Sequence, residues 1–244
     1  MSRDSVVQQL NVADYQQRKE FAERMQLLFN GNRNAVLLMS DEVHFHLNGL
    51  VNKHNFRYWA TENPCNIHEK PLHSPKVTVW CAVAKFGVIG AYFFQENGVT
   101  VTVTSQRYVH MLNTFLRPYL QRQGFNVNNV YFQQDGATAH TARASMEVVR
   151  NMFPGKLISR FGDVPWPPRS PDLSYCDYFL WGYLKERVYA HKPRNLLDLK
   201  DAITEEVNLI DQDMLTRVSN DFQQRLETCI EADGHHMTDV IFKK

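Results

Sequence analysis

The chain has 244 residues, of which 43% are hydrophobic, and its formal net charge is +1 at pH 7. This length and apolar content indicate a folded chain of one large domain or two small ones rather than a disordered one. No apolar run approaches the roughly 18 residues that a membrane span needs. The N-terminus also lacks the basic and then apolar layout of a secretory signal, so we expect neither a membrane protein nor a secreted one.

The charge is distributed unevenly along the chain. Residues 195–244 carry 5 Lys and Arg against 11 Asp and Glu, a net −6, which leaves a net +7 for residues 1–194. A basic body beside an acidic tail suits phosphate contact through one face, although an ordinary solvated surface is an equally good interpretation. The four cysteines are scattered without a close pair, so we expect reduced thiols rather than a zinc site or a disulfide framework.

The first predicted elements are a helix and a strand. Asn11 can cap an amphipathic helix over residues 12–29. Residues 35–45 then read as a strand that carries Asp41. An acid near the end of such an apolar run can present its carboxylate at the edge of a sheet.

Alternation along this strand separates two faces. Asp41 points to one face, and Glu42, His44 and His46 point to the other. We therefore expect Glu42 to lie outside any metal site at Asp41. The two histidines could chelate a metal in principle, but a polar strand face is the more ordinary interpretation.

The next segment predicts a long excursion followed by a meander. Residues 47–75 show little periodicity and include Trp59, Pro64 and Pro71, which is typical of a connection between strands. Residues 77–84 and 87–94 are strand candidates that we expect to pair antiparallel with the first strand.

The middle of the chain predicts a helix with a core-facing stripe. Ser105 can cap a helix over residues 106–122, whose apolar side chains recur at helical spacing. Pro118 should kink or shorten this helix, because proline lacks the amide hydrogen that an interior position needs.

The second half alternates between strands and helices. We predict strands over residues 130–135 and 156–161, and helices over residues 138–152 and 177–191. Residues 196–230 have the apolar spacing of two more helices, which we expect to pack on the body or between subunits.

Three acids stand in recognisable local contexts. Asp41 lies in Leu-Met-Ser-Asp-Glu, Asp135 in Phe-Gln-Gln-Asp-Gly, and Asp177 in Ser-Pro-Asp-Leu-Ser-Tyr-Cys-Asp-Tyr. Hard divalent ions prefer oxygen ligands, and two such ions about 3.5–4 Å apart can assist in-line attack on phosphorus. Carboxylates brought together without metal repel one another, which raises at least one pKa. The pattern therefore points to metal-dependent phosphoryl transfer.

These contexts and their order, with the stretch Gln-Asp-Gly-Ala-Thr-Ala-His-Thr-Ala, resemble the catalytic domain of mariner-type transposases of the DDE/DDD superfamily. The resemblance covers roughly residues 12–243. It implies an α/β, ribonuclease H-like fold, a mixed sheet flanked by helices with extra C-terminal helices. Carried over residue by residue, it makes Asp41, Asp135 and Asp177 the catalytic acids that bind two Mg²⁺ or Mn²⁺ ions.

The same resemblance implies what the protein acts on. It implies a transposase domain that cleaves DNA strands and transfers them, moving DNA by cut-and-paste into TA sites. Transposon ends and target DNA would be its partners, and a nuclear homodimer its working form. No Gly-rich phosphate loop, Ser-His-Asp signature or zinc-ligand pattern appears, so the sequence supports no nucleotide cofactor and no acyl transfer.

The third acid requires a choice, because Asp172 is also available. In the family the catalytic acid stands five positions after the Asp of Ser-Pro-Asp-Leu, which selects Asp177. We expect the Asp172 carboxylate to bond nearby backbone amides in a turn. The separation of 42 positions between Asp135 and Asp177 is longer than is usual, and we place the extra residues in 161–169. Gly136 is a second departure, because many relatives have Asn there.

Four further residues are candidates for DNA contact. His140 follows the second acid by five positions and could orient a phosphate or a carboxylate ligand, or simply bond at a helix start. Arg169, Lys185 and Arg187 are candidates by position alone, and a solvated surface cation is the more ordinary interpretation of each.

The resemblance also suggests a domain plan. We expect a helix and linker remnant in residues 1–34, a catalytic core in residues 35–194 with the inserted loop 47–75, and acidic helices in residues 195–244. No counterpart of the family's paired helix-turn-helix module precedes the first helix, so we expect weak, poorly selective and salt-dependent DNA binding.

Two other functions stay open on the sequence. One is a catalytically silent remnant that only dimerises or binds DNA, suggested by the missing recognition module. The other is a ribonuclease H-like nuclease for RNA–DNA hybrids, which fits the metal chemistry but not the local motifs.

Overall fold

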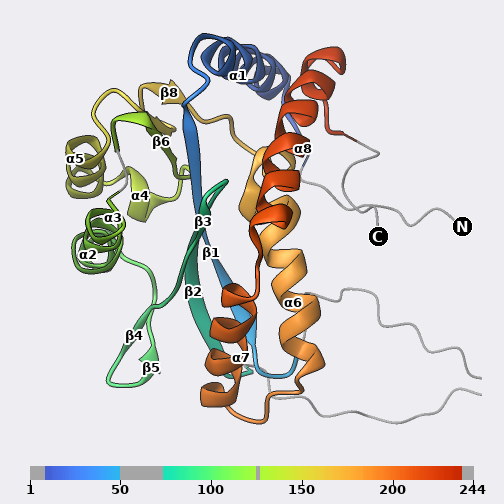
Figure 1. Cartoon of the computed structure of the whole chain (residues 1–244). Helices are drawn as coiled ribbons and strands as arrows, with labels where there is room; N and C mark the ends of the chain where they lie inside the picture. Colours follow the sequence, from blue (N-terminus) through green and yellow to red (C-terminus); the bar gives the residue numbers. More distant parts are fainter. Residues whose placement is uncertain (1–8, 50–73, 125–126, 238–244) are drawn as a thin grey trace, which may run out of the picture.

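The structure is a computed structural model that describes residues 9–49, 74–124 and 127–237. A mixed sheet stands between two layers of helices, and both layers are seen edge-on in Figure 1. Most of the predicted excursion 47–75 lies outside the described residues. Within the described part of the chain, no helix has the length and apolar character that crossing a bilayer requires.

The sheet has six strands in the order β3-β2-β1-β6-β7-β8. Its strands are β1 Val36–His46, β2 Lys76–Ala84, β3 Gly87–Phe93, β6 Val130–Gln133, β7 Leu157–Ser159 and β8 Val164–Pro165. The first three form an antiparallel meander, and β6, β7 and β8 run parallel to β1. A separate hairpin, β4 Gln95–Glu96 with β5 Val99–Thr100, follows β3. The expected α/β, ribonuclease H-like fold is confirmed.

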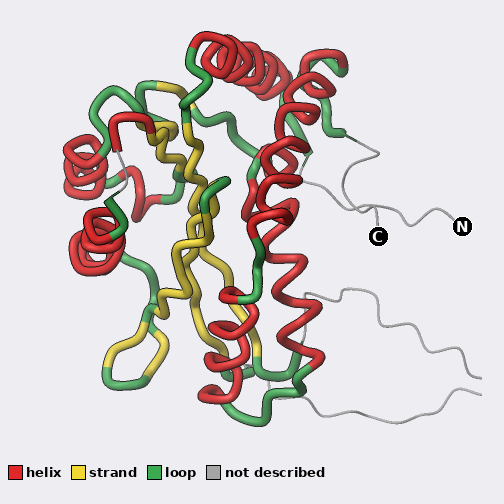
Figure 2. Tube along the Cα trace, viewed as in Figure 1, coloured by secondary structure: helices red, strands yellow, loops and turns green. Residues whose placement is uncertain are grey.

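Helices cover both faces of the sheet, as the red and yellow layers of Figure 2 show. One face carries α2 Ser105–Met111, α3 Arg117–Arg122, α4 Thr138–Thr141 and α5 Arg143–Met152. The other carries α1 Val12–Gly31, α6 Trp181–Ala190, α7 Leu196–Asn208 and α8 Gln212–Glu231. The predicted first helix and the two C-terminal helices are thereby confirmed.

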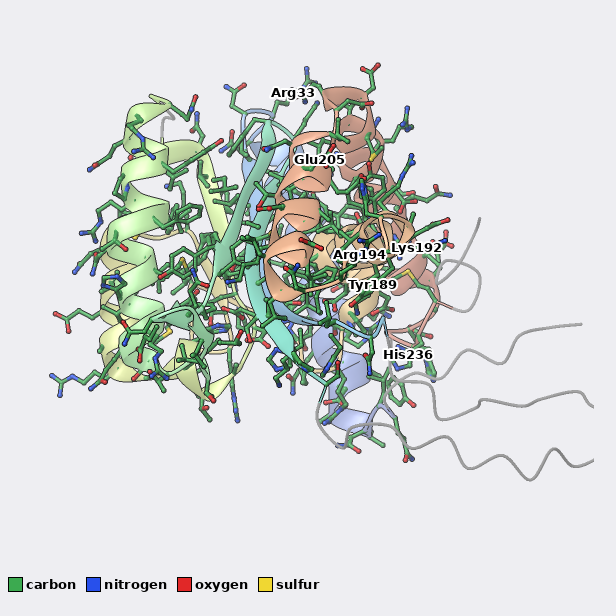
Figure 3. The ribbon with its side chains drawn as sticks, turned by 90° about the horizontal axis from the view of Figure 1, so that it is seen from below. Arg33, Tyr189, Lys192, Arg194, Glu205 and His236 are labelled. Carbon is green, nitrogen blue, oxygen red and sulfur yellow. The ribbon has the colours of Figure 1, made fainter. Side chains whose placement is uncertain are left out.

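Alternation along β1 divides the core between these two layers. Leu37, Met39 and Phe45 are buried against α1, α6, α7 and α8, whereas Leu38 is buried against α2 and α5. Successive side chains of a strand point to opposite faces, so one strand contributes to both cores. At the far end of β1, the Tyr189 hydroxyl at the end of α6 donates to the carbonyl of His46 at 2.8 Å. Tyr189 lies close to the turn that follows α6 (Figure 3).

The predicted helix 106–122 is interrupted and begins one residue earlier. Thr104, not Ser105, is its cap, because the Thr104 hydroxyl accepts from the amide of Arg107 at 3.3 Å. A π-helical turn, Leu112–Leu116, separates α2 from α3. Pro118 lies two residues after this π-helical turn, and the backbone stays right-handed helical through Leu116 and Arg117, so the proline accompanies a local distortion of the helix.

The predicted helix 138–152 is broken at Ala142, which is a correction. Ala142 has an extended backbone (φ −58°, ψ 143°) between α4 and α5. Alanine has the highest helix propensity, so the cause is tertiary. The Ser145 hydroxyl donates to the carbonyl of Ala139 at 2.6 Å, and the side chain of His140 is held by two acids.

The predicted strand 156–161 is shorter, and a further strand follows it. β7 ends at Ser159, and the chain turns at Gly162 into β8. A Cβ at Gly162 would lie 2.8 Å from the amide nitrogen of Ser159 and would also meet the carbonyl oxygen of Leu157, so only glycine fits this turn. Sequence periodicity missed β8 because it has only two residues.

Candidate active site

Asp41 lies on β1 with its carboxylate toward α6. Its Oδ2 accepts a hydrogen bond of 2.7 Å from Nε1 of Trp181. Protein surrounds the carboxylate, and Asp41 as a whole residue is only partly buried. This burial, and then the negative charges of Asp177 and Glu42, raise the pKa of Asp41 well above its ordinary value.

Asp135 lies two residues beyond the end of β6. Its Oδ1 accepts from the amide of Ala137 at 2.9 Å and lies 2.6 Å from Nδ1 of His140. Burial acts to raise the pKa of Asp135, but the hydrogen bonds and the charge of His140 outweigh it and lower the pKa. Nearly half of this side chain is exposed, so the carboxylate remains accessible.

Asp177 stands in the π-helical turn Cys176–Leu180 that leads into α6. Asp177 is exposed as a whole residue, although many protein atoms lie around its carboxylate. This crowding is the main cause that raises the pKa of Asp177 to about 6. The charge of Asp135 raises it further, whereas Ser174 and Lys185 lower it.

The structure thus brings three acids from distant parts of the chain into one electrostatic neighbourhood. Asp41 is influenced by both other carboxylates, and Asp177 by Asp135. Among the described residues, no three His, Cys, Asp or Glu side chains stand ready as a metal-binding group. The donor chemistry still fits a hard divalent cation, because the donors are carboxylate oxygens, and burial together with neighbouring negative charge raises the pKa values of Asp41 and Asp177.

His140 joins two acids, one of which the sequence-based reasoning placed outside the site. Its Nε2 lies 3.0 Å from Oε1 of Glu42, and its Nδ1 contacts Asp135. Burial lowers the pKa of His140, but the two carboxylates outweigh this effect and raise the pKa to about 10. Glu42 does point away from Asp41, as alternation predicts, yet it supports Asp135 through this ring. The Asp-Glu doublet on β1 and the histidine after the second acid were the available signals.

Asp172 does not bond to local amides, which corrects that expectation. Its Oδ1 and Oδ2 accept from the guanidinium of Arg18 on α1 at 2.7 and 2.6 Å, and both side chains are buried. Arg18 also donates to Ser170 Oγ at 2.9 Å and to the carbonyl of Gly234 at 2.8 Å. The ion pair therefore holds the segment that leads to Asp177 against α1 and the end of the described chain.

The three predicted cationic contacts have different surroundings. Nε of Arg169 donates to Oδ2 of Asp14 at 2.7 Å, so its guanidinium is paired inside the protein. Lys185 is half-buried, and burial lowers its pKa while the nearby Asp177 and Asp41 oppose this. Arg187 is exposed, with its guanidinium 5.7 Å from the ring centroid of Tyr183. All three stay predictions as DNA contacts.

Known proteins share this fold. The crystal structure of the catalytic domain of Mos1 mariner transposase has a TM-score of 0.72 and 21% sequence identity, over 96% of this chain and 100% of that chain. The Mos1 mariner paired-end complex with Mn has a TM-score of 0.77 and 20% identity, over 97% of this chain and 68% of that chain.

One curated relative is the human histone-lysine N-methyltransferase SETMAR, 24% identical over 191 residues. The match takes in 76% of this chain but only 26% of SETMAR, so the chain spans about a quarter of that relative's length. No protein-family model matches the chain. At these identities the shared property is the fold, and the resemblance to mariner-type transposases is confirmed at that level: this chain has the fold of a mariner transposase catalytic domain.

Proposed function

We propose that this chain is a metal-dependent DNA strand transferase, the catalytic domain of a transposase. The observation that carries the proposal is the convergence of Asp41, Asp135 and Asp177 from three separate elements on one electrostatic neighbourhood. The fold shared with the Mos1 catalytic domain supports it. Because nearly half of the Asp135 side chain is exposed, a phosphodiester can approach the site from this acid.

Mg²⁺ or Mn²⁺ ions held by these three acids would neutralise their charge and polarise the reacting phosphate. The residues around the acids would orient these metal ligands. Trp181 holds Asp41 through its indole N–H, and His140 holds Asp135. In cleavage a water oxygen bonds to phosphorus as the bond to the DNA 3′ oxygen breaks; in strand transfer the freed 3′ hydroxyl attacks a target phosphate in the same way.

The proposed substrate and working form follow from the resemblance. The similar structures include a Mos1 paired-end complex with the left transposon end and a Mos1 strand transfer complex. We infer by analogy that transposon ends and TA-containing target DNA are the substrates, and that the chain acts as a nuclear homodimer. The net +7 of residues 1–194 supports contact with phosphates.

Nicking of supercoiled plasmid at low salt, with Mn²⁺, Mg²⁺ or EDTA, tests the proposal. We expect metal-dependent nicking by the native chain and its loss, by at least about 100-fold, in Asp135→Asn, because one cation ligand is weakened. Arg217→Ala is the control, since Arg217 is an exposed cation on α8. Undiminished nicking by Asp135→Asn contradicts the assignment. Absence of both nicking and calorimetric Mn²⁺ binding favours a silent binding module instead.

A further inference from the structure

A groove of about 580 Å³ runs along α5 beside the candidate active site. Its lining includes Thr141, Arg143, Glu147, Arg150, Asn151 and Phe161. Thr141 follows His140, the residue that contacts Asp135, and Phe161 lies in the turn between β7 and β8. The groove therefore extends from Thr141, the residue after His140, to the turn in which we placed the extra residues 161–169.

Arg160 lies beside Phe161, which lines the groove, and against Gly136, which follows Asp135. A Cβ at Gly136 would lie 3.4 Å from Cδ and 3.7 Å from Cβ of Arg160. The stem of Arg160 thus runs over the backbone immediately after the second acid, in space that the longer side chain of Asn would need. Many relatives have Asn where this chain has Gly136. Here the side chain of Arg160 lies where that Asn side chain would be.

Phe161 is exposed on a turn that is held rigidly. Phe161 is 54% exposed, and every other phenylalanine, tyrosine or tryptophan of the described residues is more buried. The carbonyl of Phe161 accepts from Nη2 of Arg150 at 2.8 Å, and Asp163 Oδ2 accepts from the amide of Leu157 at 3.0 Å. The guanidinium of Arg160 lies 5.2 Å from the centroid of the Phe161 ring. The turn therefore presents an aromatic face beside a cation.

The charge of the groove favours an anion. Arg143, Glu147 and Arg150 recur at positions that share one face of α5, and Arg160 adds a third cation next to Phe161. Within the described residues, neither Arg143 nor Arg160 forms a salt bridge, so their charges are available to a ligand. Cations that follow a backbone, combined with an aromatic platform, are the elements of single-strand recognition.

We propose that this groove binds a single DNA strand adjoining the reacting phosphate. Arg143 and Arg160 contact its phosphates, and one unpaired base stacks on Phe161. This site rests on the proposed function, which supplies the DNA. The site adds DNA-contacting residues to the three acids, and a preference for single-stranded over double-stranded DNA.

Fluorescence anisotropy on the full chain tests the site, in EDTA so that no chemistry occurs. The probes are a short blunt DNA duplex and the same duplex with a single-stranded tail. We expect the native chain to prefer the tailed duplex. Phe161→Ala should weaken binding of the tailed duplex about 5-fold or more and leave the blunt duplex unchanged, because one base loses its stacking partner. Phe161→Tyr keeps the ring and should keep the preference.

The charge variants give a second, independent readout. Arg143→Ala and Arg160→Ala should each lower the slope of log K against log salt by about 0.7 to 0.9, as expected for one lost phosphate contact. Glu147→Gln should tighten binding. Arg217→Ala is the charge-matched control on α8, and unchanged thermal melting of the variants verifies their folding.

Three results would overturn the site: groove variants that bind like the native chain, an equal loss in Arg217→Ala, or a loss in Phe161→Ala that is the same on both probes. A native chain that binds neither probe overturns it as well. Metal-dependent plasmid nicking, measured on the same preparations with Asp135→Asn, separates these results from failure of the proposed function. Nicking that persists in every groove variant, with unchanged DNA affinity, rejects the groove alone.

Discussion

His140 contacts Asp135 Oδ1 at 2.6 Å and Glu42 Oε1 at 3.0 Å, which fixes the direction of the Asp135 carboxylate. Both ring nitrogens face acids, and the pKa raised to about 10 means that the ring is protonated at neutral pH and donates to both. The imidazolium also offsets part of the negative charge at this edge of the sheet. A single buried ring thus positions one proposed metal ligand and balances its charge.

Replacing His140 by Gln should weaken Mn²⁺ binding by about 10- to 100-fold, because residues that orient ligands have effects of this size. Isothermal titration calorimetry measures the affinity. Glu42→Gln is the companion variant: it keeps the shape, removes the charge on the far side of the ring, and should weaken Mn²⁺ binding less than His140→Gln does. Unchanged Mn²⁺ affinity in His140→Gln, in a variant that melts like the native chain, contradicts the positioning role.

At the scale of elements, the Arg18–Asp172 pair joins α1 to the segment before Asp177. Arg225 Nη1 adds a bond of 3.1 Å to the carbonyl of Asp172 from α8. A buried ion pair adds little net stability over an apolar replacement, but removing one partner leaves an uncompensated buried charge. The pair therefore specifies where the segment docks.

Arg18→Met should lower the free energy of unfolding by about 3–5 kcal/mol, because it leaves the Asp172 carboxylate buried without its partner. Urea denaturation measures the change. The double variant Arg18→Met with Asp172→Asn should recover part of this loss. Lys19→Met is the matched control on the next residue, because the Lys19–Asp233 pair is exposed and solvent screens it. Equal effects of the Arg18 and Lys19 variants would rule out a special role for the buried pair.

At the scale of the whole molecule, the crowded acids make the stability of the metal-free chain depend on pH. The pKa of Asp177 is raised to about 6 and that of Asp41 is raised as well, so the folded state holds protons that the unfolded state has released. The raised pKa of His140 acts in the same direction between its ordinary value of 6.5 and about 10. Stability falls with rising pH wherever the folded state binds more protons.

We therefore expect the metal-free chain to melt at a lower temperature at about pH 8 than at about pH 5.5. Saturating Mn²⁺ should reduce this difference, since a cation stabilises the ionised acids and binds only the folded state. Scanning calorimetry in EDTA and in Mn²⁺ measures both effects, with Asp177→Asn as the variant that should flatten the metal-free curve. A melting temperature that rises with pH in EDTA, or a pH dependence that is unchanged by Mn²⁺, contradicts the proposed clustering of the acids.

The sequence by itself determined the order and type of the main elements, the separation of faces along β1, and the three acids with their motifs. These features depend on local periodicity and on residues close together in the chain. Only the tertiary structure decided the break at Ala142, the short strand β8, the link from Glu42 to Asp135 and the pairing of Asp172 with Arg18. The link from Glu42 and the pair of Asp172 with Arg18 join residues about 100 or more positions apart, and no local pattern encodes which distant partner a buried polar group meets. The break and β8 involve close neighbours, but each is too short to leave a periodic signal.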